Sequence, residues 1–225
     1  MTVEFILASQ SPRRQTLFGL IQKPFFVMAA DVDETRQGGE SPAEYVIRLA
    51  KMKAEDVEEK VAKITTRPVV ILAADTTVVD GGEILGKPSH PAQAREILER
   101  LRGSTHSVFS GVAVRKPGDE LTLTDLVRTE VTMREYSDKE IEAYIKSGDP
   151  FDKAGAYAIQ NDDFQPVASW DGCFANVMGL PLCHVERLLA KLGVSLSAQV
   201  PVQCQGAFGY DCQIPQIIDS ADYVS

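Results

Sequence analysis

Two adjacent arginines, Arg13 and Arg14, stand where the sequence predicts the first turn of a helix. Ser11 followed by Pro12 is typical of an N-cap with proline at the first helical position. Cations in this turn oppose the helix dipole at a cost of a few tenths to about 1 kcal/mol. A bound phosphate would offset that cost, because it would meet free backbone N–H groups and two guanidinium groups. Two solvated surface arginines would give the same pattern, so both interpretations stay open.

A functional acid is predicted at Asp75, which follows the apolar run of residues 69–74. Aspartate is almost never fully buried without a partner, so a cation, a metal or hydrogen-bond donors should lie beside it. The expected place is the C-terminal end of a strand, where ligands of open α/β sheets collect. A turn-forming or capping aspartate is the alternative, and the apolar run before Asp75 favours a functional carboxylate.

Other polar groups that could bind a ligand are scattered along the chain. The acidic segment 31–34 (DVDE) offers oxygen ligands of the kind that bind magnesium or manganese together with substrate phosphates. Residues 81–88, which include Lys87, nearly match a P-loop, but Pro88 lacks the required hydroxyl and the segment resembles a hairpin, so we reject a P-loop. Gln160 could read the edge of a base through its amide. Each of these groups could also be solvated or bonded to backbone.

The elements that must position these groups alternate between strands and helices. Apolar runs and period-2 patterns predict strands at residues 3–8, 24–30, 69–79, 83–85, 108–114, 121–133, 156–160 and 166–170. Cap signals predict helices that begin near Ser11, Ser41, Pro91, Ser137 and Pro181. The intermixed order predicts an α/β fold with a mixed sheet flanked by helices. Residues 149–155 are expected to form a polar loop, and residues 194–225 a weakly structured tail.

The composition narrows the classes of ligand and partner. The 225 residues carry a formal net charge of −9, so the surface as a whole should repel long nucleic acid and anionic membranes. The apolar run near the N-terminus, residues 5–8, is too short for a signal peptide or a membrane span. The four cysteines form no C-x-x-C pair and the three histidines are scattered, which indicates neither a zinc site nor a disulfide framework. We therefore expect reduced thiols in a cytoplasmic protein.

Seven blocks of the sequence together resemble, in order and spacing, the signature blocks of the Maf family of nucleotide pyrophosphatases. They are LASQSPRR (7–14), RLAKMKA (48–54), AADTTVV (73–79), LGKP (85–88), LRGSTHSVFSGV (101–112), YIKSGDPFDKAGAYAIQ (144–160) and NVMGLP (176–181). The resemblance covers roughly residues 3–193. It predicts a Maf-like pyrophosphatase domain at residues 1–193 and leaves residues 194–225 as a C-terminal tail of unknown role.

The resemblance implies a fold similar to that of the inosine-triphosphate pyrophosphatases, with two lobes around a nucleotide cleft and usually a homodimer. It also implies hydrolysis of a nucleoside triphosphate to the monophosphate and pyrophosphate with a divalent metal, Mg²⁺ or Mn²⁺. Asp75 matches the catalytic aspartate, which would serve as general base, and Glu34 matches the acidic position near the metal, so both would be metal ligands. The phosphate-binding positions of the family fall on Ser9, Arg13, Arg14, Lys53 and Lys87.

The family divides by substrate, and its discriminating positions fall on Arg13, Thr76 and Gln160. The branch that takes methylated GTP resembles S-P-Y-R, whereas this chain has S-P-R-R at residues 11–14, which places it with the branch that takes dTTP and UTP. Two alternatives are a 7-methyl-GTP pyrophosphatase of the sibling branch and a nucleotide-binding regulator of cell division without turnover. Arg13 argues against the sibling branch. The presence of Asp75 and of the full basic set argues against the regulator.

Overall fold

The computed structural model describes residues 3–119 and 121–218. Within these residues the chain forms one seven-stranded mixed sheet. Six strands follow the order β2-β1-β3-β5-β6-β7, and the seventh, β4, pairs with β3. The strands are β1 (Glu4–Leu7), β2 (Phe25–Val27), β3 (Val69–Asp80), β4 (Glu83–Leu85), β5 (Thr105–Arg115), β6 (Leu123–Met133) and β7 (Val167–Asp171). β1 runs parallel to β2 and β3, and the other pairs are antiparallel. The expected α/β fold around a mixed sheet is confirmed.

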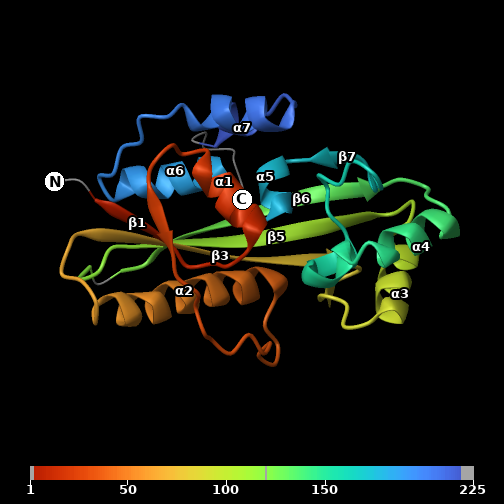
Figure 1. The fold of residues 1–225 in the computed structure, drawn as a ribbon, viewed down its shortest axis with the longest axis horizontal. Helices are drawn as coiled ribbons and strands as arrows, with labels where there is room; N and C mark the ends of the chain where they lie inside the picture. The colour runs from red at the N-terminus through yellow and green to blue at the C-terminus, as the bar shows by residue number, and fades with distance from the viewer. Residues whose placement is uncertain (1–2, 120, 219–225) are drawn as a thin grey trace.

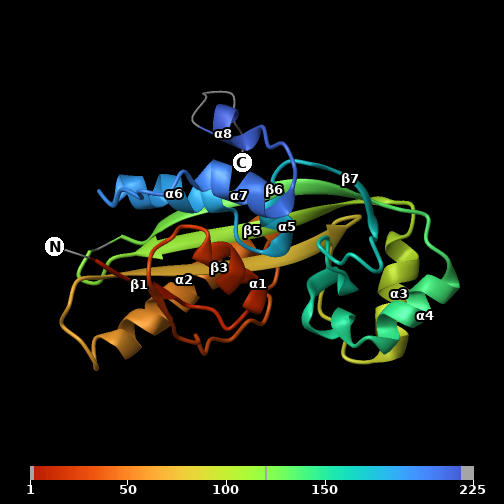
Figure 2. The same cartoon turned by 45° about the horizontal axis from the view of Figure 1, so that its top comes forward.

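Helices cover both faces of this sheet (Figures 1 and 2). They are α1 (Pro12–Gly19), α2 (Pro42–Val61), α3 (Pro91–Leu101), α4 (Asp138–Lys146), α5 (Phe174–Met178), α6 (Leu182–Lys191), α7 (Val200–Phe208) and α8 (Ile214–Ile217). α2 packs alone under one face, whereas α1, α5 and α6 pack on the other, with α7 outside them. Among the described residues, no helix is long and apolar enough to cross a bilayer.

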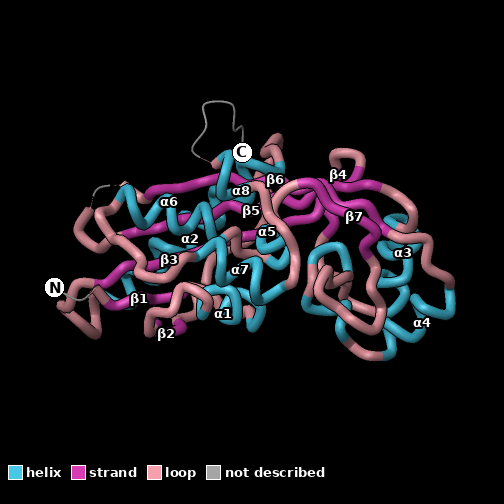
Figure 3. The backbone as a smooth tube through the Cα atoms, turned by 90° about the horizontal axis from the view of Figure 1, so that it is seen from above, coloured by secondary structure: helices cyan, strands magenta, loops and turns pink. Residues whose placement is uncertain are grey.

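The sheet joins two lobes. β3, β5 and β6 are long enough to pass through both, and α3 and α4 lie together at the end remote from β1 and β2 (Figure 3). The first lobe has an apolar core on each side of the sheet, and the second has its own core around α3, α4 and the far halves of the long strands. Side chains that are distant in sequence can therefore meet where the two lobes join.

The segment between α4 and β7 differs from the prediction. A polar loop and a strand at residues 156–160 were expected, but the chain forms two short 3-10 helices, η1 (Asp149–Asp152) and η2 (Ala154–Ala156). Gly155 and Ala156 have φ angles of 71° and 60°, which are incompatible with an extended strand. The predicted strand is therefore wrong, and Gln160 lies in a turn beyond η2.

The prediction of a weakly structured tail is also wrong for residues 200–217, which form α7 and α8. Val200 and Cys204 of α7 and Ile214 of α8 are buried in the core that covers the upper face of the sheet. Packing rather than a periodic pattern stabilises these short helices. Residues 219–225 of the predicted tail lie outside the described residues. The chain's four cysteines are all free and buried, and burial raises the pKa of each thiol.

Gly111 of β5 lets α2 approach the sheet. A Cβ atom at this position would lie 2.3 Å from the carbonyl oxygen of Val46 and 2.5 Å from its carbonyl carbon, both backbone atoms of α2. Glycine is required here by close packing rather than by its backbone angles. The contact matters for the site described below, because α2 carries Lys53.

We expect Gly111→Ala to lower the free energy of unfolding by about 1–3 kcal/mol, because an added methyl group must push the backbone of α2 away from the sheet. Denaturant titration measures the change. Gly206→Ala is the matched control: a Cβ at Gly206 in α7 would meet no atom within 4 Å, so that variant should be neutral or slightly stabilised. If Gly111→Ala unfolded at the same denaturant midpoint as the unaltered protein, α2 would have room to move away from the sheet.

Candidate active site

The candidate site opens where one edge of β3 is unpaired. β1 pairs with β3 only as far as Leu72, and β4 begins to pair at Val78. Asp75 and Thr76 lie in the gap between these two strands. The prediction that Asp75 stands at the end of its strand is therefore wrong, because β3 continues to Asp80 and the site lies beyond the carboxyl end of β1 instead.

Successive side chains of β3 point to opposite faces of the sheet. Asp75 shares its face with Ala73, which packs in the core under α2. Thr76 shares the other face with Ala74, which packs in the core that contains α1 and α5. The gap therefore places a carboxylate on one side of the sheet and a hydroxyl on the other.

A cleft of about 450 Å³ lies at this gap, which is within the range of small-molecule sites. Its polar lining consists mainly of Ser9, Arg13, Arg14, Glu34, Lys53, Thr76, Lys87, Asp152, Lys153 and Gln160. Its apolar lining includes Val78, Val108, Ala154, Tyr157, Ala158, Val177 and Met178. The structure thus gathers every predicted site residue at the cleft except Asp75, which does not line it.

Asp75 is covered by Lys53. The ammonium nitrogen of Lys53 lies 2.7 Å from Oδ1 of Asp75 and 2.6 Å from Oε1 of Glu34. The side chains of Lys53 and Asp75 are each 11% exposed, whereas that of Glu34 is 54% exposed. Asp75 thus has the charged partner that its burial requires. Lys53 thus brings the carboxylate of Glu34, from the loop before α2, close to that of Asp75 in the middle of the sheet.

Glu34 is the one acid of the segment 31–34 that joins this cluster. Partial burial by itself would raise the pKa of Glu34, but the hydrogen bond and charge of Lys53, with other nearby cations, lower that pKa below its ordinary value. Glu34 is therefore ionised at neutral pH. Asp33 instead accepts a hydrogen bond from the backbone N–H of Thr35, and neither it nor the exposed Asp31 lines the cleft.

The two carboxylates fit a divalent cation. Glu34 and Asp75 converge on one cationic point, and hard oxygen ligands of this kind suit magnesium or manganese. Across residues 3–119 and 121–218, no cluster of three or more His, Cys, Asp or Glu is arranged to hold a metal. A cation held by this pair would need oxygen atoms of water and of substrate phosphates to complete its shell, as Mg²⁺ commonly does at phosphate-transfer sites.

Arg14 is held on the opposite face of the sheet from Asp75. Its Nε donates to the carbonyl oxygen of Gly179 at 2.8 Å, and its Nη2 donates to Oγ1 of Thr76 at 3.1 Å. Ser9 accepts a longer bond, 3.5 Å, from Nη1. The Thr76 hydroxyl also lies 2.7 Å from the hydroxyl of Ser110. Thr76 is thus bonded within the protein, where it orients the guanidinium of Arg14 in the wall of the cleft.

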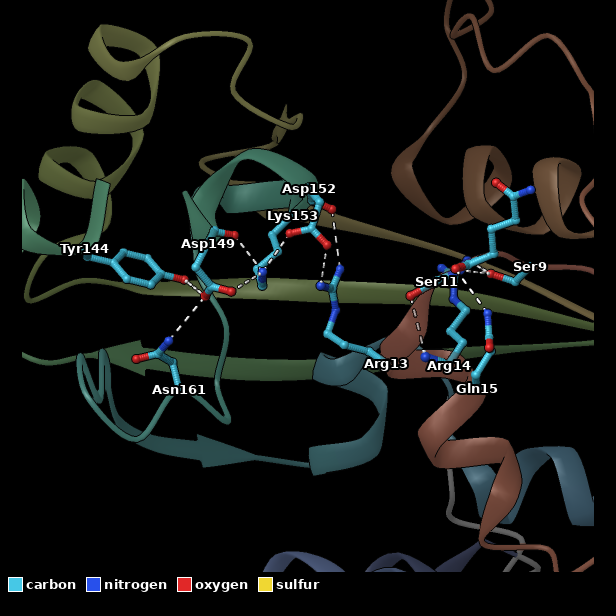
Figure 4. Close-up of polar contacts among 11 residues, drawn as sticks. Ser9, Ser11, Arg13, Arg14, Gln15, Tyr144, Asp149, Asp152, Lys153 and Asn161 are labelled. Carbon is cyan, nitrogen blue, oxygen red and sulfur yellow. Dashed lines mark hydrogen bonds and ion pairs between the residues drawn. The ribbon is translucent and has the colours of Figure 1, made fainter. Parts of the chain in front are cut away.

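Arg13 points the other way, toward the second lobe (Figure 4). Its Nη1 lies 2.7 Å from Oδ2 of Asp152, and its Nη2 donates to the backbone oxygen of the same residue at 3.4 Å. The two arginines at the start of α1 therefore find their partners inside the protein, on different sides of the cleft.

Lys87 and Gln160 are two uncommitted polar side chains among the described residues that line the cleft. Lys87 follows β4 in the turn before α3, and Gln160 follows η2. Neither side chain makes a hydrogen bond or an ion pair with another residue in the described part of the chain. Both are therefore free to meet a ligand, the first as a donor of positive charge and the second through an amide that both donates and accepts.

Sequence reasoning missed Asp152, Lys153 and Tyr157. The charges at Asp149, Asp152 and Lys153 were noted as a polar loop similar to segment 31–34, but they were given no role in the site because such a loop is usually solvated. Tyr157 was assigned to a strand. In the structure it is buried and donates or accepts a 2.7 Å hydrogen bond with Nε2 of His106, which fixes it beside the apolar lining.

Comparisons with known proteins identify the family of the chain. The family model described as Maf-like protein matches residues 4–192. A dTTP/UTP pyrophosphatase from Dictyoglomus thermophilum is 45% identical over 197 residues, covering 87% of this chain and 100% of the relative. A dTTP/UTP pyrophosphatase from Geotalea uraniireducens is 46% identical over 188 residues, covering 84% of this chain and 94% of the relative.

Likeness to solved structures is weaker. A nucleoside-triphosphatase, or dITP/XTP pyrophosphatase, from Mycobacterium abscessus has a TM-score of 0.38 at 13% identity, covering 84% of this chain and 94% of that chain. The assignment therefore depends on the family model, which spans most of the chain, and on the identity shared with relatives across nearly their whole length. This chain belongs to the family of Maf-like proteins.

Proposed function

We propose that this protein hydrolyses dTTP and UTP to the corresponding monophosphate and pyrophosphate. The observation that carries the proposal is the Lys53 ammonium group held between the carboxylates of Glu34 and Asp75 at a cleft of ligand size. Phosphoryl transfer depends mainly on positioning and charge neutralisation, and this cluster places an acid, a cation and metal-binding oxygens together. The two relatives named as dTTP/UTP pyrophosphatases support the same activity.

The two walls of the cleft suit the two parts of a nucleotide. The wall formed by the first lobe is charged and includes Arg14, Lys53 and Glu34, which suit a triphosphate with its metal. The wall formed by the second lobe includes the apolar side chains of Ala154, Tyr157 and Ala158 beside the free amide of Gln160, which suits a flat base with polar edges.

The reaction gives each polar residue a defined role. The oxygen of a water molecule forms a bond to the α-phosphorus while Asp75 accepts a proton from that water. The bond from the α-phosphorus to the oxygen shared with the β-phosphorus breaks, and pyrophosphate leaves with that oxygen. Arg14, Lys53 and Lys87 neutralise the negative charge that develops on the leaving group. A magnesium or manganese ion, when bound by Glu34 and Asp75, supplies further charge neutralisation at the phosphate oxygens.

Water labelled with ¹⁸O tests the bond that is cleaved. We expect dTTP and magnesium to give pyrophosphate, with the ¹⁸O in the thymidine monophosphate, because the water attacks the α-phosphorus. Release of inorganic phosphate would contradict the proposed cleavage. Binding of nucleotide without any turnover would instead favour a regulator over an enzyme.

A homodimer and a cytoplasmic location also belong to this proposal: the family resemblance supports the homodimer, and the four free cysteines support the location. Analytical ultracentrifugation tests the homodimer, because the measured molecular mass of a dimer would be about twice the 24.6 kDa of one chain. Fluorescent fusion or cell fractionation tests the second.

A further inference from the structure

One ion pair, between Arg13 and Asp152, spans the cleft (Figure 4). Arg13 comes from the first turn of α1 in the first lobe, and Asp152 comes from η1 in the second. The 2.7 Å contact joins residues that are 139 positions apart in the chain. Because both side chains line the cleft, a ligand there would lie against this pair.

Asp152 uses both of its carboxylate oxygens to connect two cations. Oδ2 lies next to Arg13, and Oδ1 lies 2.6 Å from the ammonium nitrogen of Lys153. Partial burial alone would raise the pKa of Asp152, but hydrogen bonds from Lys153 and Arg13 outweigh it and lower that pKa. The carboxylate is thus charged at neutral pH, and its side chain is 58% exposed.

A partly buried network of hydrogen bonds and ion pairs within the second lobe supports Asp152. The Lys153 side chain is only 7% exposed, and its ammonium group also contacts Oδ1 and the backbone oxygen of Asp149. The other carboxylate oxygen of Asp149 accepts hydrogen bonds from the Tyr144 hydroxyl and the Asn161 amide. The Lys153 ammonium group that holds Asp152 from within the second lobe is therefore itself held, which helps to fix the direction in which the Asp152 carboxylate points.

The backbone of this segment is fixed as well. Gly155 has a φ of 71°, and a Cβ there would come within 2.9 Å of the Val78 side chain on β3. Its N–H also donates to the backbone oxygen of Gly86 at 3.2 Å. The segment that carries Asp152 thus packs directly on the sheet and on the chain that follows the β3–β4 hairpin. It is therefore a rigid anchor for Arg13 on the opposite wall of the cleft.

Without Asp152, Arg13 would be an unpaired cation near the fixed guanidinium of Arg14 and would be drawn to the triphosphate. With Asp152, the guanidinium of Arg13 is held away from Arg14 and next to the apolar wall that includes Ala154 and Tyr157. Arginine is a rigid fork of donors, so its value for recognising a base carbonyl depends on a fixed orientation.

We infer that Asp152 is a positioning residue for base selection: by holding Arg13 across the cleft, it directs that guanidinium to the carbonyl edge of uracil and thymine rather than to phosphate. This inference rests on the proposed hydrolysis of dTTP and UTP and deepens it. Asp152 acts through Arg13, so its removal should change which nucleotide is preferred more than it changes catalysis in general.

Steady-state kinetics of Asp152→Asn with dTTP, UTP, CTP and GTP tests the inference. We expect the ratio of kcat/KM for dTTP to that for CTP to fall about tenfold, which corresponds to about 1.4 kcal/mol. Most of the decrease in kcat/KM should occur with dTTP and UTP as substrates. Asp152→Glu keeps the charge and should restore most of the ratio. Asp163→Asn is the matched control, because Asp163 is an exposed acid of the same lobe outside the cleft.

A double-mutant cycle separates positioning from a structural role. In an Arg13→Lys background, which lacks the guanidinium fork, Asp152→Asn should leave the dTTP-to-CTP ratio unchanged within about twofold. Equal losses on all four nucleotides, or additive effects of the two substitutions, would overturn the inference while leaving the proposed function intact. Absence of pyrophosphate release from every nucleotide by the unaltered protein would overturn the proposed function first, and the inference with it.

Discussion

We expect Asp75→Asn to leave a folded protein whose kcat is lower by about 10²-fold or more. The amide keeps the shape of the carboxylate but cannot accept the proton of the attacking water, and it removes a negative metal ligand. The fold should survive because Lys53 keeps its contact with Glu34 when Asp75 loses its charge. Pyrophosphate release with saturating dTTP measures kcat, and a thermal melt checks the fold.

Asp80→Asn is the matched control for this substitution. Asp80 lies on the same strand but pairs with Arg100 of α3, whereas Asp75 pairs with Lys53 beside Glu34. Its amide variant should therefore keep the kcat of the unaltered protein. If Asp75→Asn kept more than about a tenth of that kcat, the general base would have to be another group.

The second large effect is expected at Lys53, whose replacement should separate catalysis from metal binding. Lys53→Met leaves the carboxylates of Glu34 and Asp75 facing each other without a cation, and it removes a positive charge from the reacting phosphates. We expect kcat/KM for dTTP to fall about 10²- to 10³-fold, the usual range for the loss of one electrostatic contact to a transition state.

Affinity for Mn²⁺ in the absence of nucleotide should move in the opposite direction. The ammonium group and a divalent cation compete for the same two carboxylates, so Lys53→Met should bind Mn²⁺ more tightly in calorimetric titrations. Lys51→Met, an exposed lysine two positions earlier on α2, is the control for both readouts. Weaker Mn²⁺ binding by Lys53→Met would mean that Glu34 and Asp75 do not form the metal site.

The features that could be predicted from the sequence were those set by local patterns. Asp75 was identified because an apolar run led directly to an acid, and the start of α1 because serine precedes proline. Lys53 was different: within a helix it resembles any surface lysine, and only the resemblance to a family marked it. Its contact with Asp75 exists because Gly111 lets α2 lie close to the sheet, which no local pattern records.

Contacts between distant segments could not be predicted for the same physical reason. The partner of Arg13 lies in a segment whose path depends on left-handed backbone at Gly155 and Ala156, and a run of small and aromatic residues there resembles a strand. The helix α7 carries no charged residue and little periodicity, so its stability depends on packing that appears only in the folded chain.

Base selection follows from the hydrogen-bonding edges of the pyrimidines. Uracil and thymine present two carbonyl acceptors on either side of one N–H donor. In the proposed site Arg13 would supply donors, and the free amide of Gln160 would supply both a donor and an acceptor. Cytosine replaces one carbonyl with an amino group, which would face a donor and leave polar groups unpaired at a cost of about 1–3 kcal/mol. A purine has a second ring that the cleft of a pyrimidine site does not favour.

The most direct test of the account is kcat/KM for pyrophosphate release from the eight common nucleoside triphosphates and from 7-methyl-GTP. The account predicts that dTTP and UTP exceed CTP by ~5- to 150-fold, the equivalent of the unpaired-group cost, and exceed the purine nucleotides as well. Gln160→Ala should narrow the gap between dTTP and CTP rather than lower all rates equally. A rate for CTP or 7-methyl-GTP equal to that for dTTP would contradict the assignment.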